Sequence, residues 1–152
     1  EPFIKLFLEV QTEDNYNIAI IPGYYLTERE KLLLEKDENI TIAKDLITPT
    51  TCYYWADIAI ITSGMSRFEA ACCGIPALYL YRNYFQEKNA FELHPCAGWA
   101  VGNMGAIKSR LLVDRIATMS VDARQNMSNN GKALVDGKGI DRIIGVLRGL
   151  LE

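Results

Sequence analysis

The chain has 152 residues, a net charge of −3, and a composition that is 49% hydrophobic and 23% charged. This length and balance are typical of one globular domain with a substantial core, and they exclude disordered and fibrous proteins. The acidic balance argues against a protein that holds nucleic acid by its phosphates, although a helix start can still bind one small phosphorylated ligand.

Apolar segments of strand length alternate with helical segments along the chain. Thr27 and Glu30 form a predicted capping box, and Gly74 is a predicted helix end. Strands are predicted at residues 17–22, 39–43, 57–62, 76–81 and 98–101. Helices are predicted at residues 2–11, 28–36, 49–55, 66–73, 89–93, 105–118, 121–131 and 140–151.

Strands that alternate with helices form parallel sheets covered by helices on both faces. The sequence therefore predicts one α/β domain over residues 1–152, a doubly wound parallel sheet of the Rossmann type. Such folds begin with a central strand, whereas this chain begins with a predicted helix. We therefore expect the first strand to come from a segment upstream of Glu1, in a longer two-domain protein.

The sequence offers little for metal binding or membrane insertion. Its four cysteines, Cys52, Cys72, Cys73 and Cys96, form no C-x-x-C pair, and His94 is the single histidine. Metal sites need ligands at close spacing, so we expect no metal. Unpaired thiols in apolar segments favour a reducing, cytoplasmic location. No apolar run approaches about 20 residues, the length of a membrane-spanning helix.

The loop after the predicted strand at 57–62 carries the richest pattern. Ligands of open α/β sheets bind at the carboxyl ends of strands. Gly64 allows a ligand to approach the backbone closely. Met65, Ser66 and Arg67 are expected to present free backbone N–H groups at a helix start. Such a helix end favours an anion, and phosphate is the predicted ligand.

Glu69, one turn into the same helix, has two interpretations. Its carboxylate can accept hydrogen bonds from the vicinal hydroxyls of a sugar. Alternatively, Ser66 and Glu69 form a capping box, in which Glu69 bonds back to the helix start. A nucleophile elbow, G-x-S-x-G, is disfavoured because Phe68 stands at the last glycine position and His94 is the sole candidate base.

The polar loop at 82–89 follows the next predicted strand and should lie beside this turn. Gln86 and Asn89 offer neutral hydrogen-bonding groups there. Their alternative role is a local one, at the start of the following helix.

Two motifs occur in order. The first is S-G-M-S-R-F-E-A-A-C-C-G-I-P at 63–76, and the second is Q-E-K-N-A-F-E-L at 86–93, followed after four residues by Gly98. Together with Trp55-Ala56-Asp57 and the tail at 134–139, they resemble the C-terminal domain of GT-B enzymes that bind UDP-sugars. The resemblance covers residues 39–151.

Three groups of such enzymes carry similar patterns. They are the UDP-N-acetylglucosamine transferase that completes the lipid-linked peptidoglycan precursor, the nucleotide-sugar hydrolase of pseudaminic acid synthesis, and glycosyltransferases of spore coat polysaccharide synthesis. This chain departs from them in lacking the glycine-rich first strand and turn. Arg67 and Phe68 are also bulkier than the pattern has at these positions.

The resemblance implies roles for residues of the first motif. Gly64, Met65 and Ser66 would receive the diphosphate, with Ser63 beside them in the substrate-binding turn. Glu69 would bond the ribose hydroxyls, a role that can coexist with a capping bond.

Residues of two other loops receive roles in the same way. Gln86 and Asn89 would face the donor sugar or phosphate. Leu46 and Ile47, after the second predicted strand, would lie where the uracil stacks and bonds to the backbone.

The implied function is that of a donor-binding domain of a glycosyltransferase, which uses a UDP-sugar in cell-envelope or surface glycan synthesis without a metal or other cofactor. An N-terminal domain outside this chain would bind the acceptor, a glycan or lipid, and carry the catalytic residues, which are unknown here. A nucleotide-sugar hydrolase of the pseudaminic-acid type is the alternative enzyme.

Two further classes remain for comparison. The chain could be a subunit that works only when docked to a partner, in some cases at the membrane surface, and an exposed apolar patch near the last helix would favour this. A receiver-like domain is disfavoured, because no acidic cluster with a lysine stands at the predicted strand ends.

Overall fold

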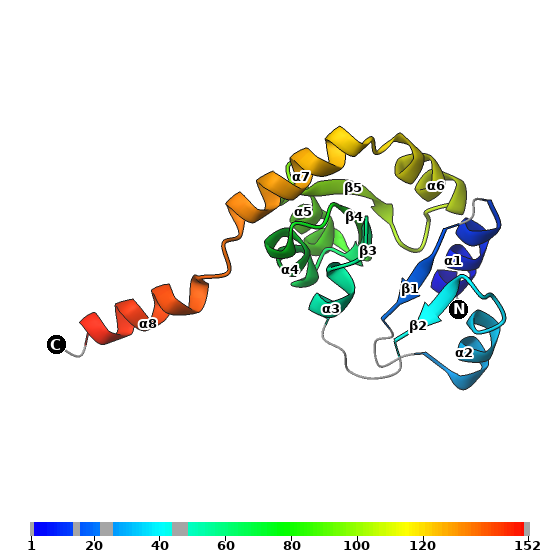
Figure 1. Ribbon diagram of the computed structural model, residues 1–152, viewed down its shortest axis with the longest axis horizontal. Helices are drawn as coiled ribbons and strands as arrows, with labels where there is room; N and C mark the ends of the chain where they lie inside the picture. Colours follow the sequence, from blue (N-terminus) through cyan, green and yellow to red (C-terminus); the bar gives the residue numbers. More distant parts are fainter. Residues whose placement is uncertain (1, 14–15, 22–25, 44–48, 151–152) are drawn as a thin grey trace.

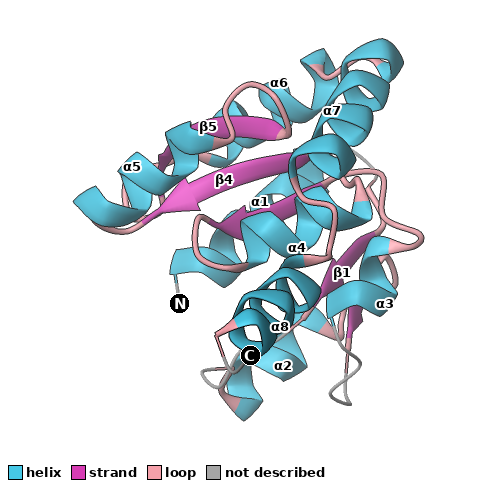
Figure 2. Ribbon diagram, turned by 90° about the vertical axis from the view of Figure 1, so that its left-hand side faces the viewer, coloured by secondary structure: helices cyan, strands magenta, loops and turns pink. Residues whose placement is uncertain are grey.

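The computed structural model describes residues 2–13, 16–21, 26–43 and 49–150. Parallel strands are flanked by helices, which confirms the predicted α/β class (Figure 1, Figure 2). The elements follow the order α1 (Pro2–Glu13), β1 (Ile18–Ile20), α2 (Glu28–Leu34), β2 (Ile40–Ile42), α3 (Pro49–Tyr53), β3 (Ala59–Thr62), α4 (Ser66–Cys73), β4 (Ala77–Tyr81), α5 (Tyr84–Glu92), β5 (Gly98–Asn103), α6 (Ser109–Thr118), α7 (Val121–Leu134) and α8 (Gly139–Gly149).

The described strands form two separate parallel sheets, as the predicted lack of a first, central strand implies. Within the described residues, β1 pairs with β2 in one parallel sheet, and β3, β4 and β5 form a second parallel sheet in that order. A doubly wound sheet has the strand order 3-2-1-4-5-6. Leaving out its first, central strand separates a pair from a triplet of strands. The observed pairing is therefore the one expected when no strand lies between β1 and β3.

Strand β4 lies at the centre of the larger sheet and is buried on both faces. Ala77 and Tyr79 face a core of mostly small residues shared with α3, α4 and α5. Leu78 and Leu80 face the opposite core, which contains residues of α1, α6 and α7. All four side chains are fully buried. This explains why residues 76–81 are continuously apolar, as strands covered on both faces require.

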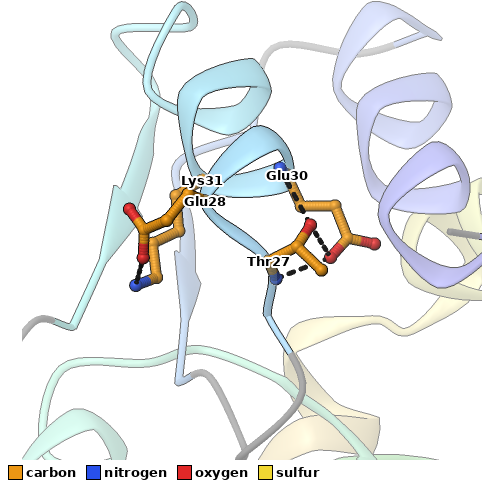
Figure 3. A network of polar contacts seen from close by, with 4 residues as sticks. All are labelled: Thr27, Glu28, Glu30 and Lys31. Carbon is orange, nitrogen blue, oxygen red and sulfur yellow. Dashed lines mark hydrogen bonds and ion pairs between the residues drawn. The ribbon is translucent and has the colours of Figure 1, made fainter.

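The smaller sheet is anchored by α1 and α2. Leu34 packs with Ile4, Ile40 and Ile42 in a third apolar cluster. The predicted capping box at the start of α2 is confirmed (Figure 3). The Glu30 carboxylate accepts bonds from the Thr27 hydroxyl at 2.6 Å and the Thr27 N–H at 2.8 Å.

The capping box also affects the charge state of its carboxylate. Hydrogen bonds from the Thr27 side chain and backbone lower the pKa of Glu30 to about 2. The ionised form is therefore the one that caps α2. Beside it, an exposed ion pair joins Lys31 to Glu28, a contact of the kind that contributes little to stability (Figure 3).

Helix α5 begins five residues earlier than the predicted helix at 89–93. Asn83 is its N-cap, and its side chain accepts a hydrogen bond from the Gln86 N–H at 3.0 Å. The first turn carries Tyr84 and Phe85, which are exposed. Helices are predicted from the regular spacing of buried apolar residues, and these two exposed aromatic residues do not follow that spacing. The sequence pattern therefore did not indicate this first turn.

Helix α7 packs closely on α4, whereas α8 projects away from the rest of the molecule (Figure 1). Gly131 allows the close approach, because a Cβ there would lie 2.9 Å from the Ala71 carbonyl oxygen. An ion pair joins α8 to the segment between α7 and α8. The Arg142 guanidinium donates to both carboxylate oxygens of Asp136, at 2.7 and 3.0 Å. These bonds lower the pKa of Asp136 to about 2.

Candidate functional site

The turn between β3 and α4 presents a run of unbonded backbone donors. The N–H groups of Gly64, Met65 and Ser66 have no hydrogen-bond acceptor among the residues that the structure describes. Our prediction placed the run one residue later. The Arg67 N–H instead bonds the Gly64 carbonyl at 3.4 Å, because the backbone has already entered the first helical turn. The three donors therefore span the start of α4, from Gly64 before the helix to its first residue Ser66. The partial positive charge of this helix end favours an anion.

The alternative capping box of Ser66 and Glu69 is wrong. Met65 is the N-cap of α4, with helical backbone angles and no side-chain cap, and Ser66 already lies within the helix. A side chain caps from the residue before the first helical one, where the backbone is extended. Ser66 is therefore one residue too late. Glu69 remains an exposed carboxylate in the first turn, on the same helix start as the free donors.

Ser63 lies in the interior and does not present a donor to a ligand. Its side chain is fully buried. The Oγ atom lies 2.5 Å from the carbonyl oxygen of Gln86 and 3.3 Å from that of Leu80. Its N–H also bonds the Leu80 carbonyl, at 3.0 Å. The predicted ligand role of Ser63 is therefore corrected: Ser63 ties the β3–α4 turn to the start of α5.

The first turn of α5 lies beside the β3–α4 turn, as predicted. The Gln86 side chain accepts a hydrogen bond from the Arg82 N–H at 2.9 Å through its Oε1 atom. Its carbonyl meets Ser63, as described above. Asn89 lies one turn further along the helix and is half-buried. Gln86 thus holds its own loop, and its amide nitrogen has no bond to the described residues.

Arg67 is a buried cation beside the turn. The sequence pattern indicated a role for its backbone N–H but none for its side chain. Its side chain is 8% exposed and pairs with the half-exposed Glu92 of α5, with Nη2 and Oε2 2.9 Å apart. Nη1 donates to the carbonyl oxygens of Ser63 at 3.2 Å and Gly64 at 2.8 Å. The guanidinium also lies over the Phe68 ring, 4.1 Å from its centroid.

Two buried tyrosines, Tyr53 and Tyr79, pack in the same apolar cluster as residues of α4. Burial raises the pKa of Tyr53 to about 12, and the charge of Glu69 contributes less. Burial likewise raises the pKa of Tyr79 to about 12, against the opposing effect of Arg67. Both phenols are therefore protonated near neutral pH. The Tyr79 hydroxyl and the Arg67 Nε are buried without a hydrogen-bond partner in the described part of the chain.

Exposed apolar side chains occur on both segments of the candidate site. Met65 is 72% exposed, and Tyr84 and Phe85 at the start of α5 are exposed to a similar degree. The two rings meet edge to face, with centroids 6.0 Å apart. The sequence prediction assigned no role to this aromatic pair.

The remaining candidates are placed elsewhere. Leu46 and Ile47 lie outside the described residues. The His94 Nδ1 accepts a hydrogen bond from the Ala100 N–H at 3.3 Å, which orients the ring locally. No group of three or more His, Cys, Asp or Glu side chains in the described ranges could hold a metal ion. Among the helices described, none has both the length and the apolar character needed to cross a membrane.

The Gly64–Ser66 turn lines neither of the two best-defined hollows among the described residues. One of them is lined by residues of α1, α2 and the turn before β2, and the other by residues of α1 and the turn before α6.

Comparisons with known proteins place this geometry in context. No protein-family model matches the chain. It is 32% identical over 100 residues to the spore coat polysaccharide biosynthesis protein SpsG of Bacillus subtilis (strain 168). The aligned region covers 64% of this chain and 30% of that protein. Its fold is similar to a crystal structure assigned as a UDP-N-acetylglucosamine 2-epimerase from Listeria monocytogenes, with a TM-score of 0.72 and 15% identity, covering 99% of this chain and 41% of that chain.

The structural similarity supports the Rossmann-like α/β fold of this chain. The chain spans less than a third of the length of SpsG and less than half of the epimerase chain. At 15% identity the second similarity concerns the fold alone. The first name refers to polysaccharide biosynthesis and the second to a UDP-sugar.

Proposed function

We propose that this chain is the donor-binding part of an enzyme that transfers a sugar from a UDP-sugar during cell-envelope or surface glycan synthesis. The observation that carries the proposal is the run of free N–H groups at Gly64, Met65 and Ser66, at the carboxyl end of β3 and the start of α4. This arrangement suits a diphosphate without a metal. In this proposal the Glu69 carboxylate, which does not cap α4, accepts hydrogen bonds from the ribose hydroxyls.

Other residues complete the proposed site. Asn89 and the amide nitrogen of Gln86 face the donor sugar or phosphate in this proposal, and Leu46 and Ile47 contact the uracil.

The proposed location is a reducing, cytoplasmic one. The supporting observation is that the cysteines are unpaired thiols: Cys52, Cys72, Cys73 and Cys96.

The first test is the binding of uridine nucleotides to this chain. UDP at 100 times its dissociation constant is expected to stabilise the folded state by about 2.7 kcal/mol and to raise the melting temperature by about 5–10 °C. ADP at the same concentration is the control for diphosphate binding alone, and it should give a clearly smaller shift. Equal shifts with ADP and UDP would contradict uracil recognition, and no shift with either would contradict the proposed site.

A nucleotide-sugar hydrolase of the pseudaminic-acid type is the alternative enzyme. The two activities differ in whether water or an acceptor hydroxyl attacks the anomeric carbon. Conversion of a UDP-sugar by the full-length protein in water alone, at the rate seen with acceptor present, would favour the hydrolase.

A specific observation favours a unit that acts only together with a second domain, in the same chain or a partner chain. Every described residue of α8 is exposed. Ile140, Ile143 and Leu147 share one face at helical spacing and are 73, 61 and 54% exposed. An apolar helix face of this kind marks an interaction surface. We propose that it packs on the domain that carries the acceptor site and catalytic residues.

Substitutions on α8 test this docking. Ile143→Gln with Leu147→Gln is expected to leave the melting temperature and UDP affinity of this chain unchanged, because neither side chain is buried here. The same pair should remove most activity of the full-length protein or complex. Arg148→Gln, on the polar face of the same helix, is the matched control. Full activity of the double variant would contradict the docking role.

A further inference from the structure

Arg67 contacts the one segment that the proposed phosphate site depends on. A single nitrogen, Nη1, donates to the carbonyl oxygens of Ser63 at 3.2 Å and Gly64 at 2.8 Å. No other side chain in the described residues bonds both carbonyls. Arg67 is 6% exposed, so these bonds form away from water, where hydrogen bonds to a charged group are strong.

The geometry of the peptide group links these carbonyls to the free donors. The Ser63 carbonyl belongs to the same peptide group as the Gly64 N–H, and the Gly64 carbonyl to the same group as the Met65 N–H. In a trans peptide the C=O and N–H point in opposite directions. Both bonds are trans, since the cis peptide of the described residues is His94–Pro95. The guanidinium therefore turns the Gly64 and Met65 N–H groups away from itself.

Arg67 is itself held in place from two sides. Glu92 of α5 bonds Nη2 at 2.9 Å, and the Phe68 ring lies against the guanidinium plane. A planar fork with several fixed donors can bond two carbonyls and a carboxylate together, which a lysine ammonium on a flexible stem does less well. The turn and α5 are thereby linked through one side chain.

We infer that Arg67 is a positioning residue for anion binding: it fixes and polarises the Gly64 and Met65 peptide groups so that both N–H groups face a phosphate. This inference rests on the proposed function, because it presupposes that the turn receives the diphosphate. It assigns to Arg67 an effect on the phosphate part of the ligand and none on the nucleoside. If Arg67 served only the stability of the fold, its substitution would change the affinities for UDP and for uridine by the same factor.

The test compares UDP with uridine, which lacks phosphate. Arg67→Met keeps an apolar side chain of similar length and removes the guanidinium group. It is expected to lower UDP affinity about tenfold while leaving uridine affinity within about twofold, both measured by NMR titration. Arg67→Lys restores the charge without the fork and should show an intermediate loss for UDP. Gly131→Ala is the control for lost stability, because it crowds the α4–α7 contact without touching the turn, and it should preserve the ratio of the two affinities.

Each outcome decides the inference. Equal losses for UDP and uridine in Arg67→Met, or no loss for either, would overturn the role of Arg67 while leaving UDP binding by the parent intact. Failure of the parent chain to bind UDP would overturn the proposed function, and the role of Arg67 with it. If Arg67→Met does not fold, Arg67→Lys decides: a UDP-selective loss supports the positioning role, and an unchanged ratio of affinities overturns it.

Discussion

Replacing Gly64 with valine is expected to abolish the stabilisation of this chain by UDP, while its own melting temperature stays within about 2 °C of the parent. Gly64 does not have a positive φ, so a side chain causes no backbone strain. A Cβ at this position meets no described atom within 4 Å. The fold therefore does not require glycine here. A valine side chain would instead occupy the space beside the free N–H groups, where the diphosphate lies in the proposed complex.

Two other glycines provide the matched controls for this experiment. Gly145→Val on α8 also enters open space, and it should leave both stability and the UDP-induced shift unchanged. Gly98→Val should lower stability strongly, because a Cβ there would lie 2.4 Å from the Ala77 carbonyl oxygen. A UDP shift that survives in Gly64→Val would show that the ligand does not approach this turn. A large loss of stability in that variant would show that glycine serves the fold.

Glu69→Ala is expected to weaken UDP binding by about 1–3 kcal/mol, a loss of about 5- to 150-fold, because the ribose hydroxyls would lose a charged acceptor. The melting temperature should fall only slightly. Glu69 caps nothing in this structure, and its remaining contribution is that of one acidic residue near a helix start, about 0.3–1 kcal/mol.

The ribose role has a sharper readout in 2′-deoxy-UDP. The parent should bind UDP more tightly than the deoxy compound, and Glu69→Ala should remove that difference. Asp122→Ala, an exposed acidic residue in the first turn of α7, controls for the loss of charge at a helix start. If Glu69→Ala weakens UDP and 2′-deoxy-UDP by the same factor, the carboxylate does not contact the 2′-hydroxyl.

Two hydrogen-bonded contacts connect the β3–α4 turn of the candidate site to α5. Ser63 connects the β3–α4 turn to the carbonyl of Gln86, and Arg67 connects it to the carboxylate of Glu92. In each contact the residue that belongs to the turn, Ser63 or Arg67, is buried, and its partner lies on α5. Gln86 and Asn89 lie on the same helix, so the proposed phosphate and sugar contacts share one support.

Local sequence rules predicted much of the fold correctly. Helix α4 begins and ends at the predicted residues, because Gly74 adopts the left-handed conformation (φ 73°) that ends a helix. The capping box at Thr27 and Glu30 is present as predicted. The start of α5 was missed, since Asn83 marks it with a single side chain and exposed aromatic residues follow. The division into two sheets agrees with the missing first strand that was expected from the sequence, whereas the pairing of strands within each sheet depends on tertiary contacts, which strand patterns do not contain.

For the site, the sequence by itself determined the position of the turn, the presence of Gly64 and the acidic residue one helical turn later. Each depends on neighbours within a few residues, which is the range over which backbone conformation and capping act. The tertiary structure alone decided that Ser63 is buried, that Ser66 does not cap α4, and that the Arg67 guanidinium is buried against the turn and bonded to Glu92. The partners of Ser63 and Arg67 lie 23 and 25 residues away in sequence. Only the packing of α5 beside the end of β3 brings such groups within hydrogen-bonding distance.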